Sequence, residues 1–127
     1  MPYTLLIVDD SKLARMAAAK ALKNLYSDWE RVEAANGDEA ISLVRETPFD
    51  IAVLDFNMPG RDGLQLAAEI LALRPSTPLA IVSANHQAEI VAQAKGIGAE
   101  FLTKPLNEQA LGAFLEGAVR RLEQAKA

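Results

Sequence analysis

The feature that most constrains the fold of this chain is an alternation of short apolar runs with longer segments of helical period. A run such as Ile51–Leu54 is short for a helix, and its branched residues suit a strand that is buried on both faces. Strands that alternate with helices form βαβ units, in which a parallel sheet carries helices on both faces. The sequence therefore predicts an α/β fold with a doubly wound sheet of five parallel strands and five helices.

The predicted strands differ in polarity, and this difference indicates which strand lies at an edge. The run around Val32 is weaker and more polar than the others, so we place it at an edge of the sheet. The five strands are predicted at Thr4–Val8, Glu30–Ala34, Ile51–Leu54, Leu79–Val82 and Phe101–Thr103.

The predicted helices are marked by apolar residues that recur at spacings of three and four. In the first helix these residues are Leu13, Met16, Ala17 and Ala21, and in the last they are Leu111, Phe114, Leu115, Ala118 and Leu122. Asn36, followed three residues later by Glu39, resembles a capping box, and Asn107 is a candidate cap of the last helix. The helices are predicted at Ser11–Leu25, from Asn36 to Glu46, from after Gly60 to Arg74, at Gln87–Lys95 and from Asn107 to Leu122, before a polar tail at Glu123–Ala127.

Length and charge limit what such a protein can do. The 127 residues, half of them hydrophobic, fit one domain, 1–127, that is large enough to bury a core. A net charge of −4 lacks the basic surplus typical of proteins that bind nucleic acid or anionic membranes. The absence of cysteine excludes disulfides, thiolate metal sites and a cysteine nucleophile, and it is compatible with a reducing cytoplasm. No apolar run approaches the roughly 20 residues that span a bilayer, so we expect a cytoplasmic protein without a membrane anchor.

Polar side chains follow four of the five apolar runs. Asp9 and Asp10 follow the first run, Asp55 the third, Ser83 the fourth and Lys104 the fifth. Parallel strands joined by right-handed crossovers end at one edge of the sheet, where ligands of open α/β folds bind, so we expect these side chains to converge. Taken singly, Asp55 also fits a turn or a helix cap, and Lys104 also fits a solvated surface lysine. The second strand ends in alanines, which fits the order 2-1-3-4-5 of flavodoxin-like sheets, an order taken from known folds.

Four segments of the chain together resemble the receiver domain of bacterial two-component response regulators. They are LLIVDDS, FDIAVLDFNMPGRDGLQL, PLAIVSAN and GAEFLTKP, in this order, and they extend over essentially the whole chain from Thr4 to the last helix. A paired Asp or a Lys-Pro alone is a weak signal, whereas all four segments with the correct spacing are highly specific. The resemblance implies a single-domain, chemotaxis-regulator-like switch that promotes only its own phosphorylation and dephosphorylation.

The resemblance also implies a role for each polar residue. Asp55 would accept the phosphoryl group, Asp9 and Asp10 would form the acidic pair, and Lys104 would be the lysine of the family's site. Ser83 stands where threonine is more usual, and Phe101 stands where many members carry a tyrosine that takes part in the switch. Neither departure threatens the chemistry.

The partners are implied by the same resemblance. The phosphodonor would be a phosphohistidine on a histidine kinase or a histidine phosphotransfer protein. The output face would comprise the helix at Gln87–Lys95, the strand at Phe101–Thr103 and the last helix. A flagellar motor, a kinase, a phosphotransfer protein or a second copy of the chain, giving a homodimer, would bind there.

The predicted carboxylate cluster indicates a cation. Three clustered carboxylates repel one another, so they either protonate in part or recruit a cation, and oxygen donors favour a hard ion such as Mg²⁺, with Mn²⁺ as a substitute. We expect Asp10 and Asp55 as direct ligands and, by resemblance, the main-chain carbonyl of Asn57, with Asp9 acting through water. With the cation and Lys104 neutralising the phosphoryl oxygens, a carboxylate oxygen of Asp55 can attack phosphorus in line. Ser83 would then donate a hydrogen bond to a phosphoryl oxygen.

Three other classes fit part of this pattern. A Mg²⁺ phosphotransferase of the haloacid dehalogenase type also uses an Asp nucleophile, but it requires a second Asp where this chain has Asn57. A receiver-like module that binds partners without phosphorylation usually lacks an acidic residue or the lysine, and this chain retains both kinds. A flavodoxin needs a hydroxyl- and glycine-rich phosphate loop after the first strand, where this chain carries the anionic pair Asp9 and Asp10.

Overall fold

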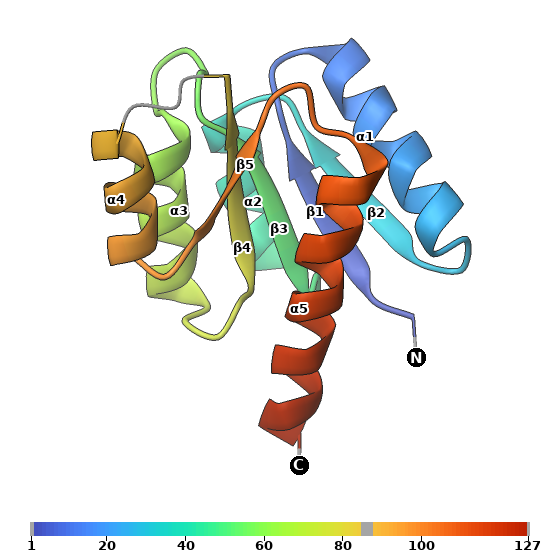
Figure 1. Ribbon diagram of the computed structural model, residues 1–127. Coiled ribbons are helices and arrows are strands. Elements are labelled where there is room, and N and C mark those ends of the chain that lie inside the picture. The colour runs from blue at the N-terminus through green and yellow to red at the C-terminus, as the bar shows by residue number, and fades with distance from the viewer. Residues whose placement is uncertain (1, 85–87, 127) are drawn as a thin grey trace.

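The computed structural model describes residues 2–84 and 88–126. In it, a parallel sheet lies between two layers of helices (Figure 1). The strands are β1 (Thr4–Val8), β2 (Glu30–Ala34), β3 (Ile51–Asp55), β4 (Leu79–Ser83) and β5 (Glu100–Thr103). The helices are α1 (Lys12–Leu25), α2 (Gly37–Glu46), α3 (Gly63–Leu73), α4 (Ala88–Gly96) and α5 (Glu108–Lys126). The order β2-β1-β3-β4-β5 confirms the predicted fold, with the polar strand β2 at an edge.

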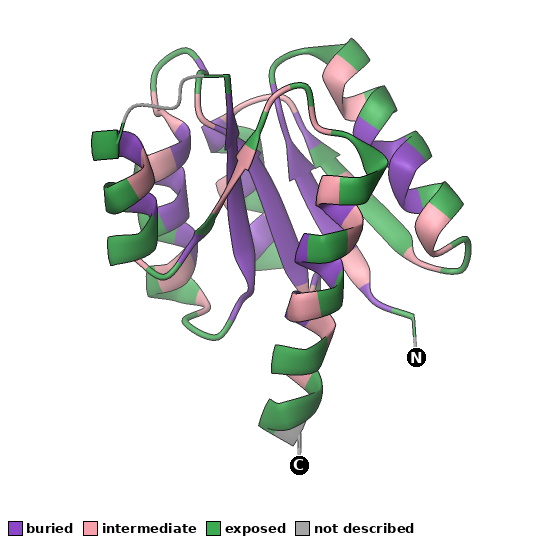
Figure 2. Cartoon of the chain, viewed as in Figure 1, coloured by how far each residue is buried: buried purple, intermediate pink, exposed green. Residues whose placement is uncertain are grey.

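The two faces of the sheet bury separate hydrophobic clusters, which explains why the central strands are apolar throughout. In β1, Leu6 and Val8 pack toward α2, α3 and α4, whereas Leu5 and Ile7 pack toward α1 and α5. Successive side chains of a strand point to opposite faces, so a strand covered on both sides favours apolar residues at every position before its carboxyl end. The buried colouring of the central strands in Figure 2 shows this two-sided coverage.

Side-chain caps set the starts of four helices close to the predicted positions. Ser11 is the N-cap of α1, and Asn36 accepts a hydrogen bond from the Glu39 N–H at 2.9 Å at the start of α2. Asn107 accepts one from the Ala110 N–H at 2.7 Å before α5. Helix α3 begins with a full capping box. Gln87, the predicted first residue of the fourth helix, lies outside the described residues.

The apolar repeat that predicted α1 lies away from the sheet at three of its four positions, although the helix itself is confirmed. Leu13 and Met16 are 78% and 55% exposed, and Ala17 is also exposed. The residues that pack on the sheet are those around Ala18, Ala21 and Leu22. An alanine-rich helix carries overlapping stripes of small apolar residues, and the sequence pattern alone does not distinguish the one that packs. The first turns of α1 therefore present apolar side chains to solvent, and Figure 2 colours much of this part of the ribbon as exposed.

The polar tail predicted from Glu123 is wrong as well, because α5 continues to Lys126. The Tyr3 hydroxyl donates a hydrogen bond to the Glu123 carboxylate, and this bond raises the pKa of Tyr3 to about 12. Polar residues such as Glu, Gln and Lys favour helix almost as well as Leu does, so their polarity did not mark a helix end. Among the described residues, no helix combines the length and the apolar character that crossing a membrane requires.

Candidate functional site

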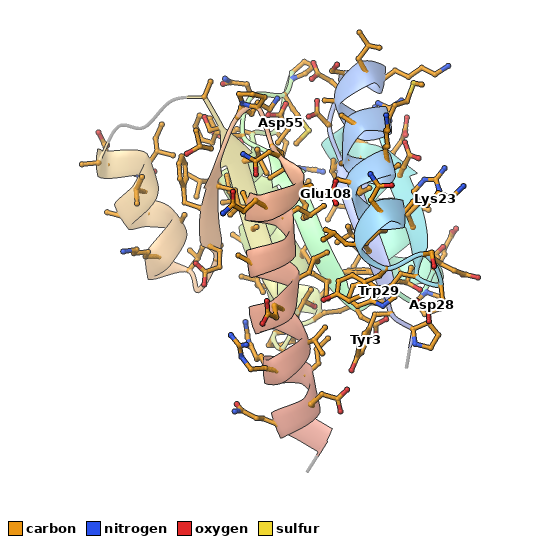
Figure 3. All side chains as sticks on the ribbon, turned by 45° about the vertical axis from the view of Figure 1, so that its right-hand side comes forward. Tyr3, Lys23, Asp28, Trp29, Asp55 and Glu108 are labelled. Atoms are coloured by element: carbon orange, nitrogen blue, oxygen red, sulfur yellow. The ribbon has the colours of Figure 1, made fainter. Side chains whose placement is uncertain are left out.

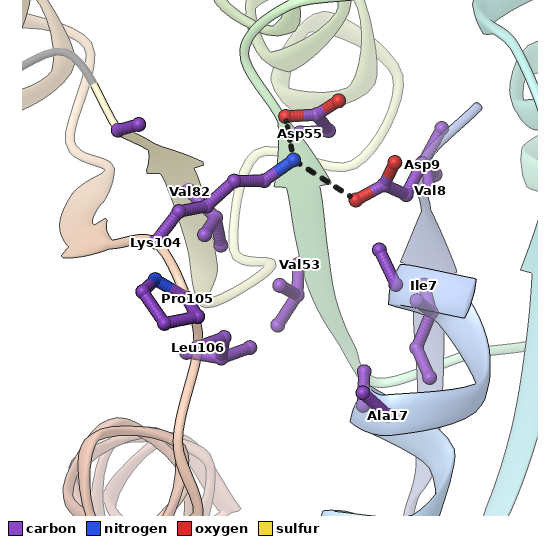
Figure 4. A pocket seen from close by; sticks show the side chains of 13 residues that line it. Ile7, Val8, Asp9, Ala17, Val53, Asp55, Val82, Lys104, Pro105 and Leu106 are labelled. Atoms are coloured by element: carbon purple, nitrogen blue, oxygen red, sulfur yellow. Dashed lines mark ion pairs between the residues drawn. The ribbon is translucent and has the colours of Figure 1, made fainter. Parts of the chain in front are cut away.

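Three side chains from separate elements meet at the carboxyl edge of the sheet. Asp55 is the last residue of β3, Asp9 follows β1, and Lys104 follows β5. The Lys104 Nζ lies 2.9 Å from Asp55 Oδ1 and 3.4 Å from Asp9 Oδ2 (Figure 4). Asp55 is only 3% exposed, so the ammonium group compensates a carboxylate that water reaches poorly.

An acidic cluster surrounds this ion pair. Carboxylate oxygens of Asp9, Asp10 and Asp55 lie within 4.8 Å of one another. Asp9 already uses both of its oxygens, since Oδ1 accepts a hydrogen bond from the Ser11 N–H at 2.9 Å and Oδ2 pairs with Lys104. Asp10 is exposed. The donor set consists of oxygens carrying excess negative charge, and it therefore fits a hard divalent cation such as Mg²⁺.

The pKa values of Asp55 and Lys104 are both raised, but by different causes. Burial raises the pKa of the Asp55 carboxyl above its ordinary value of 3.8, the charge of Asp9 raises it further, and Lys104 and a main-chain hydrogen bond from Asn57 act in the opposite direction. Burial also lowers the pKa of Lys104, but the two carboxylates outweigh it and raise that pKa above 10.5 overall. Lys104 is thus cationic at neutral pH. Any further positive charge would stabilise the ionised form of the carboxyl cluster.

The other predicted site residues occupy the same edge. Ser83 ends β4, is 1% exposed, and accepts a hydrogen bond at its carbonyl from the Lys104 N–H at 3.0 Å. It lies one residue beyond Val82, the partner of Asp55 in the sheet register. Asn57 is exposed in the loop after β3. Phe101 is half-buried on β5, where it pairs with Ile81, one register level before Asp55 and Val82.

One arginine that the sequence reasoning missed supports the acidic pair. Arg15 Nη1 donates a hydrogen bond to the Asp9 carbonyl at 2.7 Å, and Arg15 Nε pairs with Glu33 at 3.3 Å. The side chain is only 17% exposed, so it packs beside the site. A basic residue one turn into the helix that follows an acidic pair was the available signal.

An apolar cavity of about 320 Å³ extends from the ion pair between α1 and the segment after β5. Figure 4 shows Asp9, Asp55 and Lys104 together at one end of it and apolar side chains below them. The sequence did not predict this cavity, because it depends on how far α1 stands from the chain at 104–106. The apolar lining consists of Ile7, Val8, Ala14, Ala17, Ala18, Val53, Val82, Ala84, Pro105 and Leu106.

Comparisons with known proteins identify relatives of this chain in sequence and in fold. The chemotaxis protein CheY of Listeria monocytogenes is 39% identical over 118 residues, which are 91% of this chain and 98% of that protein. The transcriptional regulatory protein PdtaR of Mycobacterium tuberculosis is 34% identical over 129 residues and aligns with 100% of this chain, which spans only 62% of PdtaR. Among solved structures, CheY4 of Vibrio cholerae superposes with a TM-score of 0.84 at 26% identity, over 93% of this chain and 99% of that one.

The family itself follows from a profile match that extends over most of the chain. The model of the response regulator receiver domain matches residues 5–116, which include all of the sheet except the first residue of β1, together with the acidic edge described above. Members of this family function as signalling switches in two-component systems. This chain therefore belongs to the response regulator receiver domain family.

Proposed function

We propose that residues 1–127 form one receiver domain that is switched by phosphorylation of Asp55. The observation that carries this proposal is the position of the Lys104 ammonium, 2.9 Å from Asp55 and 3.4 Å from Asp9, at an edge that holds three carboxylates. A purely structural ion pair needs one carboxylate. A cluster with surplus negative charge is suited to bind a cation and then a phosphoryl group. The absence of cysteine is compatible with a cytoplasmic location.

The chain's own residues supply the nucleophile and most of the positioning. An Asp55 carboxylate oxygen forms a bond to phosphorus while the P–N bond to the donor's histidine breaks and the imidazole nitrogen keeps the electron pair. Lys104 exchanges its contact with Asp55 for one with a phosphoryl oxygen, and Ser83 donates a hydrogen bond to another. Asp10, Asp55 and the Asn57 carbonyl would hold Mg²⁺, with Asp9 acting through water, and the bound ion would neutralise charge on the phosphoryl oxygens. The domain promotes only its own phosphorylation and dephosphorylation.

A direct experiment tests this function. The protein is incubated with Mg²⁺ and a small acyl phosphate, and intact mass spectrometry should show one added phosphoryl group that hydroxylamine removes. Peptide mapping should place the group on Asp55. Absence of labelling from both the small donor and a histidine phosphotransfer protein would instead favour a module that binds partners without phosphorylation.

Metal affinity should distinguish the two neighbouring acids. Asp10→Asn is expected to weaken Mg²⁺ binding about tenfold or more, because it removes a direct ligand, whereas Asp9→Asn removes a group that acts through water. Asp9 already accepts a hydrogen bond from the Ser11 N–H and forms an ion pair with Lys104, whereas Asp10 is exposed. Isothermal titration with MgCl₂ measures both variants. Equal and negligible losses would refute this assignment of ligands.

The exposed start of α1 is a suitable surface for a protein donor. Leu13 is 78% exposed and precedes Ala14, which lines the cavity that leads to Asp55. We expect Leu13→Ser to slow phosphotransfer from a histidine kinase or phosphotransfer protein about tenfold, the size of a moderate interface contact. The rate from a small acyl phosphate should stay unchanged, because that donor needs no docking surface.

The control for this prediction is a leucine of similar character away from the site. Leu73→Ser removes a 47% exposed leucine at the end of α3 and should change neither rate. Time courses of phosphorylation with each kind of donor give the rates for wild type, Leu13→Ser and Leu73→Ser. Equal slowing of both donors by Leu13→Ser would show damage to the site and would contradict a docking role.

The output face should respond to phosphorylation through β4 and β5. Ser83 is buried at the end of β4, and Phe101 is half-buried on the neighbouring strand β5. When the Ser83 hydroxyl turns to the phosphoryl group, the ring of Phe101 can move inward, since it has no hydroxyl to satisfy, and the surface of α4, β5 and α5 changes. A downstream protein or a second copy of the chain would bind this surface.

Hydrogen exchange with and without beryllofluoride, a phosphoryl mimic, tests this output. Changes should concentrate at 83–95 and 101–111. Changes confined to the neighbourhood of Asp55 would defeat the mechanism.

A further inference from the structure

The loop at residues 56–62 joins β3 to α3 and carries Asn57 two residues after Asp55. Its two ends are held together by main-chain contacts. The Gly63 N–H donates a hydrogen bond to the Phe56 carbonyl at 2.9 Å, and a Cβ at Gly63 would lie only 2.5 Å from the Asp55 carbonyl oxygen. The position of this loop is therefore coupled to the backbone at the end of β3.

Arg61 holds the middle of the loop to two helices. Its Nε lies 2.7 Å from the Glu69 carboxylate on α3, and its Nη1 lies 3.3 Å from the Asp38 carboxylate in the first turn of α2. The stem of the side chain passes over Gly37, where an added Cβ would lie 2.9 Å from the Arg61 Cδ. One side chain thus connects the loop to α2 and α3.

This arrangement differs from an ordinary surface ion pair, which contributes little because water competes for both charges. Asp38 is 94% exposed, so its contact with Arg61 is weak, but Arg61 is only 30% exposed and packs its stem on Gly37. Within the described part of the chain, Nη1 is buried and makes no hydrogen bond of acceptable geometry. A cation beside the first turn of α2 also meets the unfavourable end of the helix dipole. Solvation and helix electrostatics therefore do not explain the position of the Arg61 guanidinium. Packing on Gly37 and the ion pair with Glu69 explain it.

We propose that Arg61 is a positioning residue that fixes the loop 56–62 against α2 and α3 and thereby fixes the Asn57 carbonyl for Mg²⁺. The inference rests on the proposed function, because it assigns a support to the same site. Arg61 touches neither the cation nor the phosphoryl group in this proposal. Its effect is on the order of the loop, and through that order on the affinity for the cation.

Substitution of Arg61 should separate its effect on loop order and cation affinity from any effect on the phosphorylation reaction itself. Arg61→Met keeps a stem of similar length and removes the guanidinium, so the amides at 57–61 should exchange faster in the metal-free protein. The Mg²⁺ dissociation constant should rise about tenfold, as for other residues that orient a ligand. The phosphorylation rate at saturating Mg²⁺ should stay unchanged, since the reacting groups are intact. Arg61→Lys keeps the charge and should recover part of both losses.

A second variant tests the packing contact. Gly37→Ala places a methyl group against the Arg61 stem and should also speed loop exchange and weaken Mg²⁺ binding. In an Arg61→Ala background the same change should have no effect on either, because the two effects are coupled. Arg120→Met, which removes an exposed pair with Glu116 on α5, is the control and should change neither measurement.

The outcomes distinguish this inference from the proposed function. If the amides at 57–61 exchange at the same rate in Arg61→Met as in wild type, the inference is overturned, whether or not the protein binds Mg²⁺. Faster exchange throughout the molecule with a lower urea midpoint shows a general structural role and overturns it as well. Faster exchange confined to 57–61, in a wild-type protein that neither binds Mg²⁺ nor accepts phosphate, supports the role of Arg61 in the loop and removes the proposed function.

Discussion

Asp55→Asn and Asp55→Ala are expected to abolish phosphorylation from any donor. An amide oxygen or a methyl group offers no carboxylate nucleophile, and the remaining acids of the cluster are placed differently. Asp9 is held by Ser11 and Lys104, and Asp10 is exposed. Intact mass spectrometry after incubation with Mg²⁺ and a small acyl phosphate should show no added mass.

The matched control is an acid far from the site. Asp28→Asn alters an exposed residue at the opposite end of the sheet from Asp55 and should be labelled like wild type (Figure 3). Undiminished labelling of Asp55→Ala would remove the assignment of the phosphoacceptor.

Asp55→Asn should also raise the free energy of unfolding at neutral pH. Because burial raises the pKa of Asp55 in the folded state, the folded protein favours the neutral carboxyl more than the unfolded chain does. Its contribution to the free energy of unfolding is therefore fully present below pH 3.8 and is lost as the pH rises through the raised folded-state pKa. At pH 7, Asp55→Asn should unfold at a higher urea concentration than wild type, and this difference should shrink below pH 3.8.

Lys104→Met is expected to slow phosphorylation by about 10²–10³-fold, the usual cost of removing one group that stabilises charge in the transition state. The fold should persist, because the side chain is 31% exposed and lies outside both hydrophobic clusters. Lys104 lowers the pKa of Asp55, so its loss should also move the pH dependence of phosphorylation to higher pH.

Rapid-mixing kinetics with a small donor at saturating Mg²⁺, with circular dichroism alongside, measure this effect. Lys23→Met, at an exposed lysine on α1, is the control and should behave like wild type (Figure 3). A collapsed circular dichroism spectrum for Lys104→Met would indicate a structural role for the lysine instead.

Local patterns predicted the fold well, because both faces of the central strands are buried. The period of apolar residues placed β1 and β2 at their observed bounds, and it missed only single residues at the ends of β3, β4 and β5. Asp55 and Ser83 are the last residues of their strands rather than the first residues beyond them. The polar groups at strand ends then predicted the convergence of Asp9, Asp55 and Lys104, because parallel strands share one edge.

Features that depend on contacts between distant segments were not predictable in this way. The burial of α1 depends on which of two overlapping apolar stripes faces the sheet, and Leu13 and Met16 are on the stripe that does not. Arg15 and Arg61 are ordinary basic residues in the sequence, and only their neighbours in space distinguish them. Hydrophobic period specifies where an element lies, but the partner of a long polar side chain depends on tertiary packing.

The aromatic cluster at the far end of the sheet has a consequence for spectroscopy. Trp29 is the chain's single tryptophan; it stacks on Tyr26 at 4.2 Å and meets Tyr3 edge-on at 5.3 Å, at the opposite end of the sheet from Asp55 (Figure 3). Its fluorescence should report the loss of tertiary packing on unfolding and should be nearly insensitive to the charge on Asp55. Emission can therefore follow unfolding of the phosphorylated and unphosphorylated protein with the same signal, so that the difference between the two curves measures how much phosphorylation stabilises the fold.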